Sequence, residues 1–221
     1  MTHTQSHEEL AHIRGLMDRS TRFLSLSGLS GVIAGVFALA GAFIAHTYMA
    51  NNLAVAEDPL SYGRNGAIQQ DYLTHVTVLG GIAVGVLILA ITGALWFTLR
   101  RSKRMGQSLW DASARRMAIN LALPLAAGGV FCLALLWHGL PGLVAPATLL
   151  FYGLALLNAS KYTLNEIRWL GLCEVALGVA GSFWIGAGLL FWALGFGVLH
   201  IFYGSLMYLR HERGNTSTTE A

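Results

Sequence analysis

The sequence predicts an all-α, polytopic integral membrane protein: a bundle of six transmembrane helices with the N and C termini in the cytoplasm. Of the 221 residues, 55% are hydrophobic and only 11% are charged, and the mean hydropathy is +0.57. Soluble domains carry roughly 25% charged residues, so this composition indicates a chain whose surface lies in lipid. The apolar residues also fall into six long stretches, each of about the length that crosses a bilayer.

The chain begins with a polar segment, residues 1–22, which we expect to form an amphipathic helix at the cytoplasmic membrane surface. Leu10, Ile13 and Leu16 recur at helical spacing among arginines, a pattern typical of interfacial helices. A transmembrane domain, residues 23–210, and a polar tail, residues 211–221, follow. We expect the six spans at about residues 23–49, 75–99, 117–138, 143–159, 164–184 and 188–210.

The first span is too long to be a cleaved signal peptide, whose apolar core has about 7–15 residues. Ser27, Gly31 and Gly35 recur every four positions in it. Small residues at this spacing form a ridge that a neighbouring helix can approach closely. Gly81 and Gly85 offer a notch of the same spacing in the second span, so we expect the first two helices to pack through these residues.

Turn-forming and basic residues separate the later spans. Asn65 and Gly66 lie in the longest predicted loop, residues 50–74, and a cluster of basic residues occupies the loop 100–116. Glycine and proline at 139–142 turn the chain into the fourth span. The fifth and sixth spans form a hairpin around the uncharged turn 182–188.

The basic residues predict the orientation. With six spans, every lysine and arginine except Arg64 falls on the side of the two termini, and the positive-inside rule assigns that side to the cytoplasm. The net charge of +3 is thereby explained by topology, which removes most of the case for nucleic-acid binding, and we expect no nucleic-acid partner. The partners that we expect are the lipid bilayer and a protein partner at the cytoplasmic segments 1–22 and 100–116.

Two ionisable residues lie deep within the last hairpin, Glu174 in the fifth span and His200 in the sixth. Counting from the turn at about 1.5 Å per residue places them at the same depth. Hydrocarbon penalises each group alone, so we expect both to face the bundle interior and to form a buried polar pair, with Tyr203 on the same face as His200. Three interpretations stay open: a structural hydrogen bond, a proton-linked role in transport or sensing, or two groups facing different neighbours.

Three histidines fall at the predicted outer boundary: His46, His75 and His138. Asp71 precedes His75 by one helical turn. Neutral imidazole and carboxylate together can bind zinc, copper or iron, so these residues form a candidate metal or haem site. No local signature such as HExxH accompanies them, and the sequence requires no cofactor.

Residues 19–31 (RSTRFLSLSGLSG) and 189–212 (LLFWALGFGVLHIFYGSLMYLRHE) resemble a group of uncharacterised bacterial six-helix inner-membrane proteins. The resemblance implies the six-helix architecture and a location in the bacterial inner membrane. It assigns no functional residue to this chain.

No catalytic motif was recognised: the nucleophile pattern GxSxG and the phosphate-binding glycine patterns are missing. The leading hypothesis is therefore an inner-membrane protein with a sensory, scaffolding or regulatory role. The first alternative is a small proton-coupled transporter that uses Glu174 and His200. The second is a membrane enzyme with a metal or haem at His46, His75 and His138.

Overall fold

The computed structural model describes residues 27–52, 65–105 and 112–211, and every regular element within these ranges is helical. The predicted helix at 1–22 and the tail at 212–221 lie outside the described residues. The elements are α2 (Gly28–Asn52), α3 (Asn65–Met105), α4 (Ala112–Trp137), η3 (Pro141–Leu143), α5 (Val144–Ala159), η4 (Ser160–Tyr162), α6 (Asn165–Phe183), η5 (Ile185–Ala187), α7 (Gly188–Trp192), η6 (Ala193–Leu199) and α8 (His200–His211). The last three form one continuous helix, in which η6 is π-helical.

Five helices in the described residues are long and apolar enough to cross a bilayer. They are Gly28–Asn52, Leu73–Lys103, Ala112–Trp137, Pro141–Tyr162 and Ile185–His211. α6 has 19 residues, which is roughly 28 Å of helix. It is not among the five because it carries Glu166, Arg168 and Glu174.

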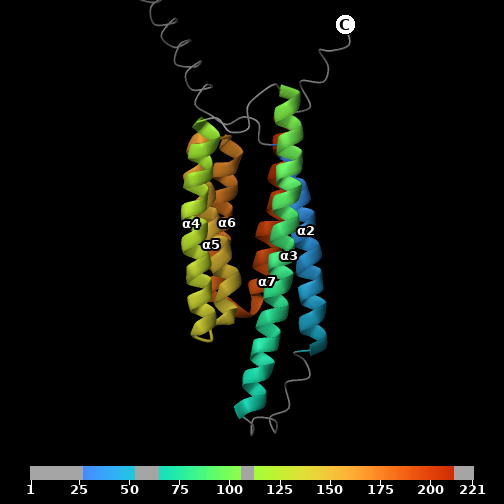
Figure 1. Cartoon of the computed structure of the whole chain (residues 1–221), viewed down its shortest axis with the longest axis vertical. Coiled ribbons are helices and arrows are strands. Elements are labelled where there is room, and N and C mark those ends of the chain that lie inside the picture. Colours follow the sequence, from blue (N-terminus) through green and yellow to red (C-terminus); the bar gives the residue numbers. More distant parts are fainter. Residues whose placement is uncertain (1–26, 53–64, 106–111, 212–221) are drawn as a thin grey trace, which may run out of the picture.

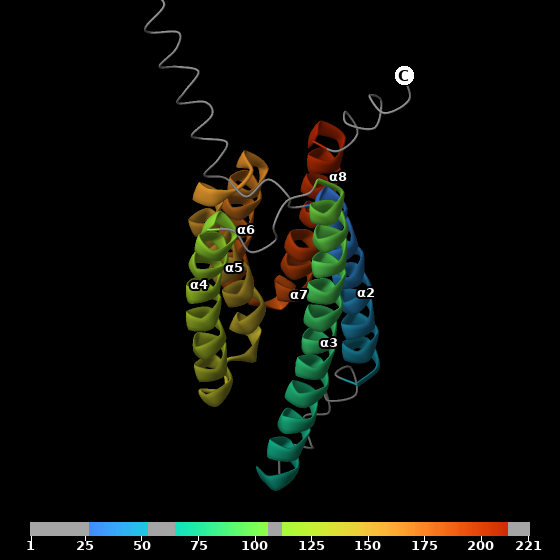
Figure 2. The ribbon, with the colours of Figure 1, turned by 45° about the horizontal axis from the view of Figure 1, so that its top comes forward.

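The helices form two groups of three, which Figures 1 and 2 show side by side. In the α4–α6 group, α5 packs against both α4 and α6; in the α2–α3–α8 group, α2 packs against α3 and against η6 and α8. The two groups meet where α5 and α6 contact the continuous helix formed by α7, η6 and α8. A buried apolar cluster lies at this junction and comprises Leu156, Leu164, Ile167, Leu170 and Met207.

α4 continues through Pro124 because a side chain of α5 replaces the missing hydrogen bond. Proline has no backbone N–H, so the carbonyl of Asn120, four residues earlier, loses its partner within the helix. The side-chain amide of Asn158 donates to this carbonyl at 3.0 Å. A polar residue near the end of α5 thus stabilises both the proline position and the α4–α5 contact. The chain then leaves α4 at Gly139, whose φ of +69° suits glycine.

Glycines bring backbones close together inside each group. A Cβ on Gly204 of α8 would lie 2.7 Å from the Gly28 carbonyl oxygen and the Val32 nitrogen of α2, and a Cβ on Gly35 would lie 2.7 Å from the Gly197 carbonyl oxygen. In the α4–α6 group, a Cβ on Gly153 would lie 2.7 Å from the carbonyl oxygen of Gly171. Only glycine permits such an approach.

The first two helices pack together as predicted, but the residues predicted to make the contact were wrong. Gly31 and Gly35 face the last helix, through Gly204 and Gly197, and Ser27 at the start of this ridge is buried. Gly81 and Gly85 of α3 have nothing within 4 Å of an added Cβ. α3 does pack against α2, but bulky side chains make that contact: Val86 of α3 lies against Gly41, and Ile33 of α2 lies against Gly93.

α3 is longer than the sequence predicted. It begins at Asn65 and ends at Met105, so the expected loops 50–74 and 100–116 are both shortened by helix. Asn65 and Gly66 start the helix instead of making a turn within a loop, because the residues that follow include no proline and sustain helical hydrogen bonding. The part of the second loop from 106 to 111 lies outside the described residues.

The basic side chains that the structure describes gather at one end of the molecule. They lie at the end of α3, the start of α4, the junction of α5 and α6, and the end of α8, which Figure 1 shows at the same end. They are Arg100, Arg101, Lys103, Arg115, Arg116, Lys161, Arg168 and Arg210.

The outer faces of the helices are apolar and exposed. Phe43 on α2 is 69% exposed, and Leu123 on α4 is 72% exposed. Such faces are buried in soluble bundles, because apolar surface avoids water. Together with the five apolar spans, they make this a polytopic membrane protein whose exterior contacts the lipid bilayer.

Candidate functional site

Glu174 is the most unusual side chain in the described structure. It lies at the middle of α6, it is 0% exposed, and neither carboxyl oxygen has a hydrogen-bond partner among the described residues. Its nearest charged or ionisable neighbour is His200, whose Nδ1 lies 3.4 Å from Oε1. An ionised carboxylate with no hydrogen bond is very costly in an apolar interior. The arrangement therefore favours the neutral acid, with one proton on Glu174.

His200, on the last helix, makes two hydrogen bonds that do not involve Glu174. Its Nδ1 lies 3.0 Å from the carbonyl oxygen of Gly195, and its Nε2 lies 2.8 Å from the hydroxyl of Tyr152 on α5. A carbonyl oxygen only accepts, so Nδ1 carries the hydrogen. In the neutral imidazole Nε2 then accepts from the tyrosine hydroxyl. The contacts thus determine the tautomer and direct Nδ1–H toward Gly195 and Glu174.

The π-helical segment η6 shapes this site. It includes Gly195 and Gly197, and π-helical turns occur often at functional sites. A Cβ on Gly195 would collide with Oε2 of Glu174 and with Leu149, so glycine is needed for the carboxyl to fit. Gly197 lies on the opposite side against Leu39 of α2. The segment therefore fits between the two helix groups because both positions lack side chains.

Aromatic rings surround the same pair. The rings of Phe196 and His200 stack at 5.9 Å, and Tyr152 and Trp192 each lie 5.0 Å from Phe196. Tyr152, Phe196 and Trp192 are half-buried, whereas Glu174 is completely enclosed. We call Tyr152, Trp192 and Phe196 the aromatic cluster.

The structure brings Glu174 and His200 together, but Tyr203 takes a different partner. The hydroxyl of Tyr203 lies 3.7 Å from Sγ of Cys173, away from His200. The residue that sequence reasoning missed is Tyr152. It stands in an apolar stretch, where a tyrosine resembles any core aromatic residue, and no spacing links it to a histidine 48 positions away.

The three predicted metal-binding histidines are not brought together. His75 Nδ1 bonds the hydroxyl of Tyr48 at 2.9 Å, while His46 and His138 are exposed. His138 follows α4 in one helix group, and the other two histidines belong to the second group. Among the residues whose side chains are described, no three ligating side chains form a metal site, and the side chain of Asp71 lies outside them.

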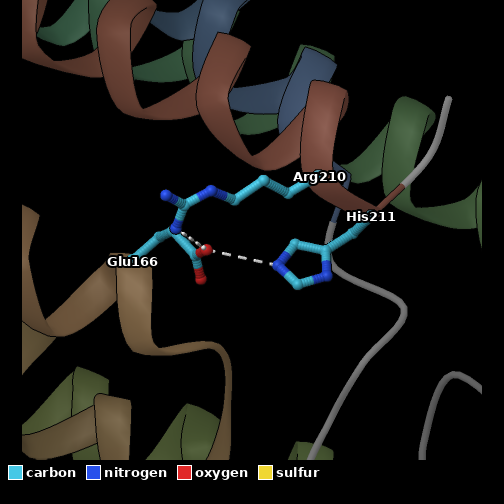
Figure 3. A network of polar contacts seen from close by, with 3 residues as sticks. All are labelled: Glu166, Arg210 and His211. Atoms are coloured by element: carbon cyan, nitrogen blue, oxygen red, sulfur yellow. Dashed lines mark hydrogen bonds and ion pairs between the residues drawn. The ribbon is translucent and has the colours of Figure 1, made fainter. Parts of the chain in front are cut away.

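A second polar contact joins the two helix groups at the basic end of the molecule. Oε1 of Glu166, at the start of α6, lies 3.3 Å from Nη1 of Arg210 and 3.3 Å from Nε2 of His211, both at the end of α8 (Figure 3). Glu166 is buried, and Arg210 and His211 reach it from the surface. The basic end of α8 is thus held to the start of α6 by polar contacts.

Removal of the Tyr152 hydroxyl should weaken the protein measurably. Tyr152→Phe keeps the ring but leaves Nε2 of buried His200 without a donor, so we expect a loss of about 1–3 kcal/mol in the free energy of unfolding. Tyr48→Phe is the matched control. It breaks the same kind of tyrosine–histidine bond at His75, near a helix end where water can replace it, and should cost less. Equal losses in a denaturant titration followed by circular dichroism would contradict this account.

Comparisons with protein-family models, with curated proteins and with solved structures find no match to this chain. An enclosed acid beside a neutral histidine can hold, release or pass a proton.

Proposed function

We propose that the protein is a proton-linked membrane carrier whose working site is Glu174 with His200. The observation that supports this proposal is the fully buried carboxyl of Glu174, which has no hydrogen-bond partner among the described residues. Ionisable groups inside a membrane are expensive to keep and commonly mark proton relays and transport pathways. A purely structural pair would be expected to satisfy its hydrogen bonds, and this carboxyl does not.

The position of the pair supports a link between proton binding and movement. Glu174 belongs to the α4–α6 group, and His200 belongs to the α2–α3–α8 group. Carriers commonly expose a central site alternately to each side by rocking one helix bundle against another. Loss of the proton from Glu174 would place a negative charge at the contact between the two helix groups. A buried charge is disfavoured there, so it would favour a different packing of one group against the other.

A spin-label distance measurement tests the proposal. The exposed ends of α2 and α4 belong to different groups, so labels at Asn52→Cys and His138→Cys report on their separation; Cys132 and Cys173 are first replaced by alanine. We expect the distance distribution to shift between acidic and alkaline buffer in this background, and to stay constant when Glu174→Gln is added. A pH shift that survives Glu174→Gln, or no shift at all, would refute the proposal.

For the topology we propose six spans, in which α6 crosses the membrane in addition to the five apolar helices, with both termini in the cytoplasm and the bacterial inner membrane as the location. The gathering of the described basic residues at one end of the molecule supports this topology. α6 is roughly as long as the bilayer core is thick, and its ionisable residue Glu174 is buried inside the bundle.

Labelling of single cysteines in intact cells tests the orientation. In a background without Cys132 and Cys173, Asn52→Cys should react with a membrane-impermeant maleimide, and Lys103→Cys should react only after the cells are opened, because their helix ends lie on opposite sides. The reverse pattern would show that the termini face outward.

A second candidate function is that of a sensor, scaffold or regulator, and the Glu166 contact favours it. Arg210 and His211 join Glu166 at the end of the molecule where α3 ends and α4 begins, and the segment 100–116, which we expect to bind a protein partner, includes these two helix ends. In this case, loss of the proton from Glu174 would change the surface that the protein partner recognises. Reconstituted vesicles separate the candidates, because a carrier moves protons or solute across the bilayer and a regulator does not.

A further inference from the structure

The aromatic cluster and Glu174 form a continuous set of contacts. From half-buried Trp192, ring contacts lead to Phe196 at 5.0 Å and on to His200 at 5.9 Å, and His200 lies 3.4 Å from the enclosed carboxyl. Tyr152 joins both Phe196 and His200, at 5.0 Å and 5.4 Å between ring centroids. Proteins use aromatic faces to bind quaternary ammonium cations, and the Glu174 carboxyl, which the cluster reaches through His200, supplies a negative charge when it loses its proton.

Charge balance limits what this site can bind. With its proton, Glu174 is neutral and the neighbouring His200 is neutral, so the site carries no net charge. When the proton leaves, a single negative charge remains in the apolar interior, where it is strongly disfavoured. One monovalent cation restores neutrality. A divalent metal ion would leave an excess positive charge, and a second anion would worsen the imbalance.

The surrounding groups favour an organic cation over a metal ion. Metal cations need several oxygen or nitrogen ligands. In the described residues the two oxygens of Glu174 are the free acceptors recorded at the site, because the Gly195 carbonyl and His200 are already hydrogen-bonded. Aromatic rings, in contrast, offer many contacts to a lipophilic cation and stabilise it through their π faces.

We propose that Glu174 and the aromatic cluster bind a lipophilic organic monocation, of the quaternary ammonium or phosphonium class, in exchange for one proton. The cation supplies one positive charge as the proton leaves Glu174 for solvent, so the charge of the site is unchanged. The inference rests on the proposed carrier function and names its substrate class. The titratable groups that face Glu174 from packed elements are His200, and Tyr152 through His200; on α6 itself, neighbouring Cys173 contacts Tyr203.

The test uses tetraphenylphosphonium and the full chain in detergent micelles. Equilibrium dialysis measures binding at several pH values, and a weakly buffered solution with a pH dye measures proton release. We expect saturable binding that tightens as the pH rises, with about one proton released per cation. Glu174→Gln should abolish the saturable component and leave only the partition into micelles.

Two pairs of variants separate the site from general effects. Phe196→Leu should weaken binding by about 2- to 30-fold, whereas Trp169→Leu, at a ring 60% exposed and outside the cluster, should not. Glu166→Gln, at a buried carboxyl outside the site, should bind as the wild type does. If Glu174→Gln fails to fold, the comparison of Phe196→Leu with Trp169→Leu decides the question.

The outcomes distinguish this inference from the carrier proposal. No saturable binding, or binding that is indifferent to pH and to Phe196→Leu, would overturn the cation site. If the spin-label distance still responds to pH through Glu174 in that case, the proton-linked function stands and its substrate is of another class. If binding depends on Glu174 and the aromatic cluster but the distance between the groups never responds to pH, the cation site stands without a proton-driven movement.

Discussion

His200→Leu is expected to lower the free energy of unfolding by about 2–4 kcal/mol, whereas Glu174→Gln is expected to change it by less than about 1 kcal/mol. The asymmetry follows from the contacts. His200 holds the Tyr152 hydroxyl and the Gly195 carbonyl, and both lose their partner when the imidazole is removed. Glu174 makes no hydrogen bond among the described residues, so its neutral isostere loses little.

A denaturant titration in mixed micelles, followed by far-ultraviolet circular dichroism, measures both effects. The double variant Glu174→Leu with His200→Leu is the control. In His200→Leu the buried carboxyl of Glu174 stays in place without its histidine neighbour. The double variant also removes this carboxyl, so it should recover part of the free energy of unfolding that His200→Leu loses. If Glu174→Gln cost as much as His200→Leu, the Glu174–His200 contact itself would be the main stabilising interaction. The pair would then be a structural lock.

Gly204→Leu is expected to lower the free energy of unfolding by about 2 kcal/mol or more, because it forces α2 and the last helix apart. A Cβ at Gly204 would already lie 2.7 Å from backbone atoms of Gly28 and Val32, which cannot move aside as a flexible side chain can. The same α2 residues position the helix that carries His200, so the variant should also weaken the contact between the helix groups.

Gly85→Leu is the matched control. It makes the same substitution in the interior of a membrane helix, and nothing lies within 4 Å of an added Cβ at this position. We expect it to be neutral or slightly stabilising, because leucine favours a helix more than glycine does and fits the lipid-facing surface of α3. If the two variants lost stability equally, the close approach of α2 to the last helix would not be a main source of stability.

Local patterns in the sequence predict well how deep a residue lies in the membrane, and predict poorly which helix lies beside it. Glu174 and His200 lie on adjacent helices joined by a short turn, and the constant rise of a helix is enough to place them level. The glycine spacing of Gly31 and Gly35 likewise marks a face that another helix approaches. It does not identify the partner, because any helix with small residues fits such a face. The ridge of the first helix packs against Gly204, which is remote in sequence, and not against Gly81 and Gly85 as predicted.

The remaining site residues depend on how the helices are arranged around one another. Tyr152 reaches His200 only because α5 packs beside the last helix, and no pattern in its own segment indicates that contact. The three predicted metal-binding histidines show the opposite case: the sequence places His46, His75 and His138 near one boundary, but His138 belongs to the other helix group. The π-helical turn at η6 also has no periodic signature, although its two glycines mark where side chains do not fit.

The most direct test of the account is infrared spectroscopy of the carboxyl group of Glu174. A protonated carboxylic acid in an apolar site has a carbonyl stretching band that is separate from the bands of carboxylates and amides. We predict such a band in the wild type and in Glu166→Gln, its loss in Glu174→Gln, and its disappearance when tetraphenylphosphonium displaces the proton. A spectrum of the wild type without this band would mean that Glu174 does not hold a proton, and would contradict the central claim.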